Sequence, residues 1–177
     1  MTNWVSQNIT DELPHIWRFA VRLTRSRVIA EDLVQKTAVR ALERSHQFTT
    51  GSKLRSWLYS IMHSIWKNEL RAEQLRRESI SNLAEIEHYE SPSSSEETNQ
   101  LFKEVVSEVN ALPDNQRVVM LLVCVEGYSY QETSDILDIK IGTVMSRLAR
   151  ARLTIGQTFL EPRRAKLKKP GNCYESQ

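Results

Sequence analysis

Residues 129–150 read SYQETSDILDIKIGTVMSRLAR, and this stretch decides the fold of the C-terminal half of the chain. Ser129 and Glu132 have the spacing of a capping box, in which each side chain accepts a hydrogen bond from the other residue's backbone N–H. The helix that starts there is expected to end at Leu137, and a tight turn is expected over 138–140. Because a longer, basic helix follows the turn, the pattern predicts a helix-turn-helix.

The second helix of this motif carries the side chains expected to read DNA. It is expected to begin at 142–143 and to end near Phe159, before Pro162. The start of a recognition helix meets base edges in the major groove, and Arg is the side chain best suited to guanine. A solvated basic helix is the alternative, but helix, turn and charge coincide here, which favours DNA binding. Ile136, Leu137, Ile139, Val144 and Leu148 are expected to pack the two helices together, and the expected outer face comprises Met145, Ser146, Arg147, Ala149 and Arg150.

The composition of the whole chain excludes several classes of protein. Its 177 residues are 40% hydrophobic and 26% charged, with five Gly and five Pro, which favours helix over barrel-like or collagen-like folds. No apolar run approaches the roughly 20 residues of a membrane span, and no secretory signal is visible. Cys124 and Cys173 lack the spacing of a zinc site or a disulfide scaffold. We therefore expect a cytoplasmic, all-α protein without a metal site.

The charge is distributed in blocks, although the net charge is only +2. Residues 1–78 carry 13 Lys and Arg against 8 Asp and Glu, residues 79–111 carry 1 against 7, and residues 142–169 carry 8 against 1. Two basic blocks separated by an acidic one suggest two polyanion-binding modules joined by a tether. Charge alone leaves open the alternative that these residues lie on solvated helix faces.

A polar segment separates the two halves of the chain. Residues 91–97 read SPSSSEE, and such a segment cannot bury enough apolar surface to order itself. Together with the weakly apolar stretch before it, this segment predicts a flexible linker of about twenty residues, which favours two small lobes over one domain. We expect a helical lobe over 10–77, an acidic, Ser-rich linker over 78–99, a helix-turn-helix lobe over 100–160 and a basic tail over 161–177.

Apolar residues at helical spacing predict three helices in the first lobe and a buried helix in the second. The first helix of the chain is expected to be capped by Thr10 or Asp11. Residues 114–126 contain the run VVMLLVCV, so this helix is expected to be the core of the second lobe, with Gly127 at its C-terminal cap. Core positions are expected for Trp17, Trp57 and Cys124, and the position of Trp66 is left open.

Three stretches of the chain carry a family resemblance. Residues 111–152 read ALPDNQRVVMLLVCVEGYSYQETSDILDIKIGTVMSRLARAR, residues 30–42 read AEDLVQKTAVRAL, and residues 48–71 read FTTGSKLRSWLYSIMHSIWKNELR. They resemble the −35-binding domain, the polymerase-binding helix and the −10-recognition segment of the extracytoplasmic-function (ECF) sigma factors of bacterial RNA polymerase. The resemblance covers about residues 10–77 and 100–160, in the order typical of the family.

The resemblance implies a promoter-specificity subunit that binds core RNA polymerase, recognises the −35 element as duplex and holds the −10 element melted. It implies no catalytic residues and no cofactor, an acidic linker that runs through basic channels of the polymerase, and an anti-sigma factor as a further partner. Phe48 and Ser64 match the positions that pocket a base flipped from the −10 strand. The matching residues are Glu31, Asp32, Leu33, Gln35 and Lys36 for polymerase docking; Phe48, Ser60, His63, Ser64 and Lys67 for the −10 strand; and Ser146 and Arg150 for the −35 duplex. Thr143, Met145 and Arg147, near them on the same helix, complete the expected −35 contacts.

The sequence departs from the family pattern at several positions. Lys36 stands where the family usually has an acid, and Ser64 stands where it usually has Asn. His63 replaces a frequent Arg, and Ser134 replaces a small apolar residue in the first helix of the helix-turn-helix. These departures leave the preferred promoter sequence open.

Two alternative functions follow from other features. Glu43 to His46 and Glu85 to His88 are both Glu-x-x-His, a pairing that di-iron helical-bundle enzymes use twice. Because the first copy runs into a loop and the second lies at the edge of the linker, neither is expected to face a core. A helix-turn-helix regulator that never binds polymerase is the other alternative, and it leaves the first lobe without a role. We therefore expect a sigma factor rather than an enzyme.

Overall fold

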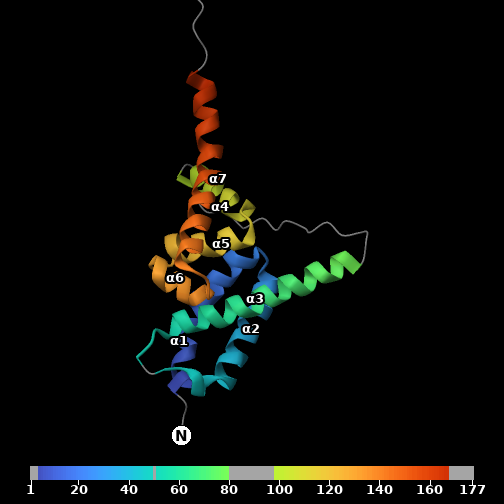
Figure 1. Ribbon diagram of the computed structural model, residues 1–177, viewed down its shortest axis with the longest axis vertical. Helices are drawn as coiled ribbons and strands as arrows, with labels where there is room; N and C mark the ends of the chain where they lie inside the picture. The colour runs from blue at the N-terminus through green and yellow to red at the C-terminus, as the bar shows by residue number, and fades with distance from the viewer. Residues whose placement is uncertain (1–3, 50, 80–97, 168–177) are drawn as a thin grey trace, which may run out of the picture.

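The computed structural model describes residues 4–49, 51–79 and 98–167, and these residues are almost entirely helical, with no strand among them. The first three helices form one lobe and the remaining helices form a second lobe that packs on it (Figure 1). No helix within these ranges is both long and apolar enough for a membrane crossing. The elements are α1 (Trp4–Thr24), α2 (Arg27–Glu43), η1 (Ser45–Gln47), α3 (Leu54–Ser79), α4 (Thr98–Ala111), α5 (Asp114–Met120), η2 (Leu121–Val125), α6 (Tyr130–Leu137) and α7 (Ile141–Leu167).

The first lobe is a three-helix bundle, as its apolar stripes predict. A tight turn joins α1 to α2, in which Arg25 adopts a left-handed φ of 60° and the Ser26 hydroxyl accepts a hydrogen bond from the N–H of Ile29 at 3.4 Å. This cap satisfies one of the free N–H groups at the start of α2 and folds α2 back against α1. The largest buried side chains of this bundle include Phe19, Leu23, Leu33, Leu58 and Met62.

The second lobe is built around α5 and the π-helical turn η2. The N–H of Glu126 bonds to the carbonyl of Leu121 at 2.9 Å, which widens the helix by one residue at its end. Gly127 then ends the segment with a φ of 76°, a left-handed conformation that suits glycine and that matches its predicted role as a cap. Helix α7 packs along α5, and α6 packs across both α7 and α3.

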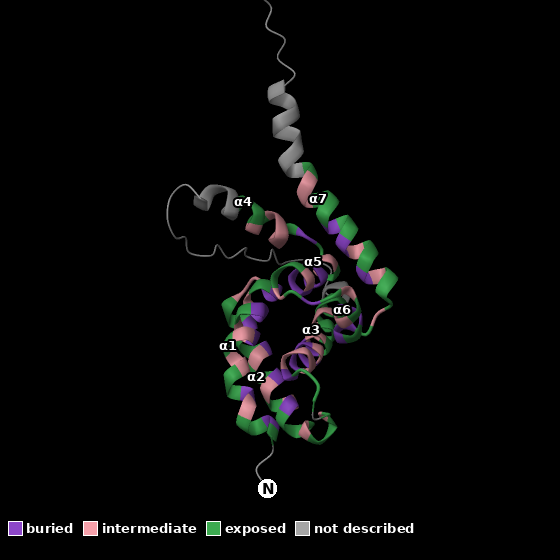
Figure 2. Ribbon diagram, turned by 90° about the vertical axis from the view of Figure 1, so that its left-hand side faces the viewer, coloured by how far each residue is buried: buried purple, intermediate pink, exposed green. Residues whose placement is uncertain are grey.

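The two lobes share an interface. Helix α6 lies on α3, and α1 contacts both α5 and η2. Tyr59 of α3 is buried, and its ring meets the ring of Tyr128 edge-on, with the ring centroids 6.0 Å apart. Buried positions, purple in Figure 2, occur in helices of both lobes. The sequence predicted two lobes joined by a flexible linker; the described parts of those lobes are in direct contact, and residues 80–97 of the linker lie outside the described residues.

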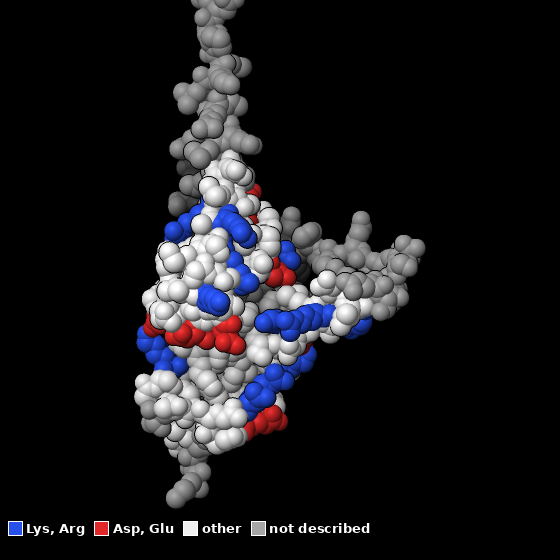
Figure 3. Space-filling view, in the orientation of Figure 1, with Lys and Arg blue, Asp and Glu red and all other residues white. Residues whose placement is uncertain are grey.

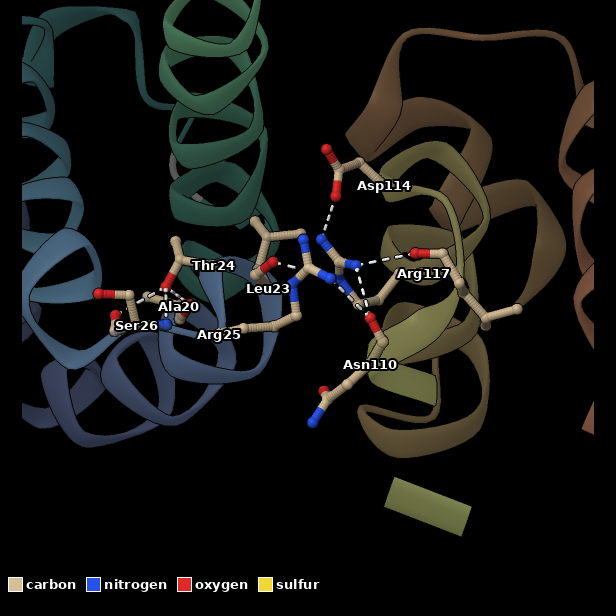
Figure 4. A network of polar contacts seen from close by, with 9 residues as sticks. Ala20, Leu23, Thr24, Arg25, Ser26, Asn110, Asp114 and Arg117 are labelled. Carbon is tan, nitrogen blue, oxygen red and sulfur yellow. Dashed lines mark hydrogen bonds and ion pairs between the residues drawn. The ribbon is translucent and has the colours of Figure 1, made fainter. Parts of the chain in front are cut away.

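A buried arginine joins α5 to the end of α1 (Figure 4). The Nε of Arg117 donates to the carbonyl of Leu23 at 3.2 Å, and its Nη2 forms an ion pair with Asp114. Arg25 and Arg117 also donate to the same carbonyl, that of Asn110, at 2.8 and 3.3 Å. Burial lowers the pKa of the Arg117 guanidinium, whereas the Asp114 carboxylate raises it. The carbonyl oxygens replace the water that this group loses on burial.

Helix α1 begins earlier than predicted. It starts at Trp4 rather than after Thr10 or Asp11, and it continues through Pro14. A proline inside a helix removes one backbone hydrogen bond, and periodicity alone does not show whether packing outweighs that loss. In this helix packing outweighs the lost hydrogen bond, because the turns before Pro14 contribute two buried side chains to the core, those of Val5 and Ile9.

Helix α7 ends later than predicted. The sequence placed its end near Phe159, with Pro162 as the stop, but the helix continues to Leu167. The residues after Pro162 are mainly Arg, Ala, Lys and Leu, which are strong helix formers and favour continuation. Residues 168–177 of the predicted basic tail, including Cys173, lie outside the described residues.

The buried stripe of the second lobe is narrower than the run VVMLLVCV suggests. Residues 118–122 are buried, but Cys124 and Val125 are exposed, so the prediction of a buried Cys124 is wrong. An all-apolar run does not show which of its sides will face the core, and the π-helical turn leaves this end on the surface. The tryptophans that pack partly buried against the core are Trp17, Trp57 and Trp66.

Candidate nucleic-acid interface

Helices α6 and α7 form the predicted helix-turn-helix. The N–H of Ser129 donates to Oε2 of Glu132 at 2.9 Å, and the N–H of Glu132 donates to the Ser129 hydroxyl at 3.2 Å, which completes the capping box. Asp138 turns the chain with a left-handed φ of 50°, and the Ser134 hydroxyl donates to the carbonyl of Ile139 at 2.5 Å. Because this last bond closes the turn between the helices, Ser134 has a structural role that the sequence did not assign.

The start of α7 presents its predicted contact residues on one face. Val144 and Leu148 are buried in the second lobe, and they fix how α7 is rotated about its axis. The hydroxyl of Ser146 donates to the carbonyl of Thr143 at 3.1 Å, so its oxygen atom can still accept a hydrogen bond. On the outer face Met145, Ser146, Ala149 and Arg150 are exposed, and Thr143 and Arg147 are half-buried.

Arg152 differs from Arg150 although it lies only two residues further along the same helix. Interactions with the Cys124 thiol, which contributes most, and with Tyr130, both in its own lobe, raise the pKa of the Arg152 guanidinium. Arg150 and Arg152 are both exposed, but Arg152 interacts with side chains of its own lobe. The pair offers a matched comparison of two arginines on one helix.

The loop after α2 carries an aromatic side chain, as predicted, and the structure adds a second ring on top of it. Phe48 stacks on Trp4, with ring centroids 5.3 Å apart and ring planes within 2° of parallel. The ring of Trp57, at the start of α3, lies 5.3 Å from Phe48 at an angle of 56°. We call these three side chains the aromatic row. Gly51, with a φ of 103°, turns the chain from the loop toward α3.

The side chains predicted to contact the −10 strand lie along α3. Ser64 and Lys67 are exposed, and Ser60 donates its hydroxyl to a backbone carbonyl of its own helix at 2.8 Å. His63 is half-buried. Burial, followed by the positive charges of Lys67 and Arg147, lowers the pKa of His63 to about 4. Arg147 belongs to α7, so its charge acts across the interface in which α6 packs on α3.

The predicted docking residues of α2 form an exposed polar face, with one exception. Glu31, Asp32 and Gln35 are exposed, and Lys36 forms ion pairs with Asp32 and, at 2.7 Å, with Glu69 of α3. Hydrogen bonds to these two carboxylates, that to Asp32 first, raise the pKa of Lys36. Leu33 is fully buried in the bundle, so its side chain does not belong to the exposed face. A shallow groove on this face is lined by Asp32, Gln35, Lys36, Val39, Arg40 and Glu43.

Charged side chains cross the interface between the lobes. Lys53, at the end of the loop, pairs with Glu132 of α6 at 2.6 Å, and chiefly this contact lowers the pKa of Glu132 to about 2. Oε1 of Glu126 lies 3.7 Å from Arg22 of α1. Acidic side chains form a band across the middle of the face in Figure 3, with basic side chains above and below it. Sequence reasoning missed these pairs because Lys53 and Glu132 are 79 residues apart.

The Glu-x-x-His pairs do not form a metal site in the part of the chain that the structure describes. Glu43 and His46 are exposed, and no group of three His, Cys, Asp or Glu side chains within that part could hold a metal ion. Glu85 and His88 lie outside the described residues.

Two family models match the chain, one in each lobe. The model described as Sigma-70 region 2 matches residues 9–76, and the model described as Sigma-70, region 4 matches residues 102–155. The first match covers most of α1 to α3, with the aromatic-bearing loop and the exposed face of α2. The second covers the helix-turn-helix and the exposed start of α7.

Comparisons with single proteins agree with these models. The ECF RNA polymerase sigma factor EcfG of Rhodopseudomonas palustris is 31% identical over 153 residues, which are 86% of this chain and 83% of the relative. The ECF RNA polymerase sigma-E factor of Haemophilus influenzae is 32% identical over 142 residues, 73% of this chain and 75% of the relative. The solved sigma factor RpoE of Bartonella quintana, in complex with the anti-sigma factor NepR, matches with a TM-score of 0.75 at 28% identity, covering 86% of this chain and 94% of that one.

Proposed function

Because this chain belongs to the ECF sigma factors of bacterial RNA polymerase, we propose that its three exposed surfaces have separate roles in promoter recognition. The chain binds core RNA polymerase and directs promoter-specific initiation of transcription. The outer face of α7 is assigned to the −35 duplex, the loop and α3 to the −10 strand, and the face of α2 to the polymerase.

The observation that carries the proposal is the outer face of α7. The capping box of α6 and the bond from Ser134 to Ile139 hold the two helices at a set angle, and Arg150 and Ser146 remain exposed near the start of α7. An exposed Arg at this point of a recognition helix can donate two hydrogen bonds to the O6 and N7 atoms of guanine. Ser146 supplies a hydroxyl that can contact either a base edge or a phosphate oxygen.

The −10 surface combines an aromatic loop with small polar side chains. A base that leaves the stack needs a ring to lie against and a polar group to read its edge, and Phe48 and Ser64 supply groups of these kinds. Lys67, exposed on α3, offers a positive charge to the phosphates. His63 is neutral at pH 7 because its pKa is lowered to about 4, so it takes part as an uncharged hydrogen-bonding group.

The packing of α6 on α3 leads us to infer that the lobes move apart during initiation. The −35 and −10 elements are centred about 25 base pairs apart, which is roughly 85 Å of duplex at 3.4 Å per base pair. In the present arrangement, α6 of the helix-turn-helix lies directly on α3, which carries the −10 surface. Both elements can therefore be bound together only after α6 and α7 leave α3.

The α2 face is suited to a basic partner surface. Glu31 and Asp32 are exposed acids on one side of the helix, and Gln35 follows one turn later. Lys36, although basic, is paired with Asp32 and Glu69, so the positive charge that departs from the family pattern is offset within the chain. We assign this face to the docking of core polymerase.

A further partner and the location of the chain follow from its membership of the ECF sigma factors. We propose that an anti-sigma protein binds this chain, since a solved sigma factor with the same fold is complexed with the anti-sigma factor NepR. We place the chain in the cytoplasm, where bacterial polymerase acts, and assign it no catalytic residues.

Run-off transcription with core polymerase on a promoter library tests the function. The chain is expected to direct transcripts from a defined subset of templates that core enzyme alone does not use. A helix-turn-helix regulator that never binds polymerase would leave the transcript pattern of core enzyme unchanged and would not be retained by core enzyme in a pull-down.

Arg150 and Arg152 of α7 test the −35 assignment. With the promoter selected from the library, Arg150→Ala is expected to weaken binding by roughly 1–3 kcal/mol and to relax the preference at one base pair. Arg152→Ala, the matched control, removes an exposed arginine that interacts with Cys124 and Tyr130 of its own lobe, and base preference should not change. Competition binding with single-base variants of the −35 element measures the affinity and the base preference of each protein variant. If Arg150→Ala weakens every duplex equally, Arg150 contacts phosphate and the assignment fails.

A further inference from the structure

The aromatic row brings Trp4 together with two rings that lie 44 and 53 residues further along the chain. Trp4 comes from the first turn of α1, Phe48 from the loop after η1, and Trp57 from the first turn of α3. Trp4 lies parallel on Phe48, and Phe48 in turn contacts Trp57. The side chain that the sequence singled out as the one aromatic of its loop is therefore the middle member of a larger cluster.

The two ends of the aromatic row differ in exposure. Phe48 and Trp57 are partly buried against the core, whereas Trp4 is 46% exposed. With Trp4 on one side and Trp57 on the other, Phe48 has little free ring surface for a further ring to stack on. The aromatic surface that an incoming base meets is that of Trp4.

Trp4 is held in place although its ring is exposed. The next residue, Val5, and Ile9 one turn later are buried, and they anchor the start of α1 to the bundle. The side-chain amide of Asn8 also donates to the carbonyl of Trp4 at 2.7 Å. A ring that is already positioned loses little conformational freedom when a ligand stacks on it.

We propose that Trp4 is the outer stacking surface of the −10 single-strand site, where an unstacked base extends the aromatic row by one ring. This proposal rests on the proposed function, because it takes the loop at Phe48 as the place where the −10 strand is held. Indole is the largest aromatic side chain, and base–aromatic stacking tolerates any base because every base has a π-face. Trp4 is therefore expected to increase affinity for the melted strand more than to select its sequence.

Holoenzyme assembled from core polymerase and the full chain tests the proposal. The probe is a fork-junction DNA, built from the strongest promoter of the library, with a single-stranded −10 non-template strand. Trp4→Leu keeps an apolar side chain but removes the ring, so we expect about 5- to 100-fold weaker binding of the fork junction. Trp4→Phe, which keeps a ring, is expected to bind within a few-fold of the wild type, and binding of duplex −35 DNA is expected to be unchanged in both variants.

A fluorescent base provides a second measurement that does not depend on stability. With 2-aminopurine at each −10 position in turn, one position is expected to show quenched emission in the wild-type and Trp4→Phe complexes and recovered emission with Trp4→Leu at saturating protein. Phe48→Ala separates the proposal for Trp4 from the assignment of the loop to the −10 strand. If Phe48→Ala weakens fork binding but Trp4→Leu does not, Trp4 is not the stacking surface and the −10 assignment stands. If neither variant changes binding, the −10 assignment itself fails. A Trp4→Phe complex as weak as Trp4→Leu also overturns the proposal.

Discussion

The hydroxyl of Tyr59 in α3 donates a hydrogen bond to Oε2 of Glu126, 2.8 Å away in the second lobe. Tyr59 is almost fully buried, and burial, followed by the contact with Glu126, raises the pKa of its phenol. The phenol therefore remains a hydrogen-bond donor over the whole range in which the protein is handled. The bond links the helix assigned to the −10 strand to the lobe assigned to the −35 element.

Tyr59→Phe is expected to lower the free energy of unfolding by about 1–3 kcal/mol, because it leaves a largely buried carboxylate with one partner fewer. Glu126→Gln keeps an acceptor for Tyr59 and is expected to cost less. Urea unfolding of both single variants and of the double variant measures their coupling. Because Gln still accepts from Tyr59, strictly additive effects would show that the negative charge of Glu126 does not strengthen the bond.

Arg117→Met is expected to destabilise the protein by about 3–5 kcal/mol. The substitution keeps the length of the side chain but leaves the carbonyl of Leu23 without its buried donor and the interface without its central charge. Arg76→Met is the control, since Arg76 is an exposed residue paired with Glu73, and such pairs contribute about 0–1 kcal/mol. Thermal unfolding, monitored by circular dichroism, gives the melting temperatures of the two variants for comparison. Equal melting temperatures would contradict a structural role for the Arg117 network.

His63 is expected to make stability depend on pH. Its pKa is lowered from 6.5 to about 4 in the folded chain, so between these values the unfolded chain binds a proton that the folded chain does not. The free energy of unfolding therefore falls as the pH drops from about 6.5 to about 4, by up to roughly 3 kcal/mol for this group.

Unfolding curves of His63→Gln at several pH values check this prediction. The variant is expected to lose stability less steeply than the wild type in that window, because Gln does not take up a proton. His46→Gln changes an exposed histidine and is expected to follow the wild type. A His63→Gln curve parallel to the wild type would show that His63 is solvated rather than buried beside Lys67 and Arg147.

Asp32→Arg together with Gln35→Ala is expected to weaken polymerase binding at least ten-fold, or about 1.4 kcal/mol, while the helical circular dichroism is retained. The reversal places a positive charge beside Lys36 and removes the acid that pairs with it. Asp11→Arg reverses an exposed acid on α1 and serves as the control. Pull-down with core enzyme reports the binding. Unchanged retention of the double variant would remove the α2 face from the docking surface.

The sequence predicted the helix-turn-helix because its determinants are local. Ser129 and Glu132 are three residues apart, and the turn at Asp138 follows directly after the helix that they start. The outer face of α7 could be predicted for the same reason, since helical periodicity places Val144 and Leu148 inward and Arg150 outward.

Sequence reasoning failed where a choice depended on packing. The continuation of α1 through Pro14 and the exposure of Cys124 each depend on which side of a helix meets another helix. Trp4 was not predicted to lie near Phe48, because nothing in the intervening 43 residues indicates that α1 begins beside the loop. Such contacts become visible only when three segments are folded together.

The amino-acid sequence by itself determined the all-helical fold, the capping box, the helix-turn-helix and the order of the surfaces along the chain. Each of these depends on residues within a turn or two of one another, so local hydrogen bonding and helical periodicity suffice. Only the tertiary structure decided that the lobes share an interface, that Arg117 is buried in it and that His63 lies near Arg147. The contacts of Arg117 with Leu23 and of Tyr59 with Glu126 join residues 94 and 67 positions apart, and burial at such distances depends on how whole helices pack.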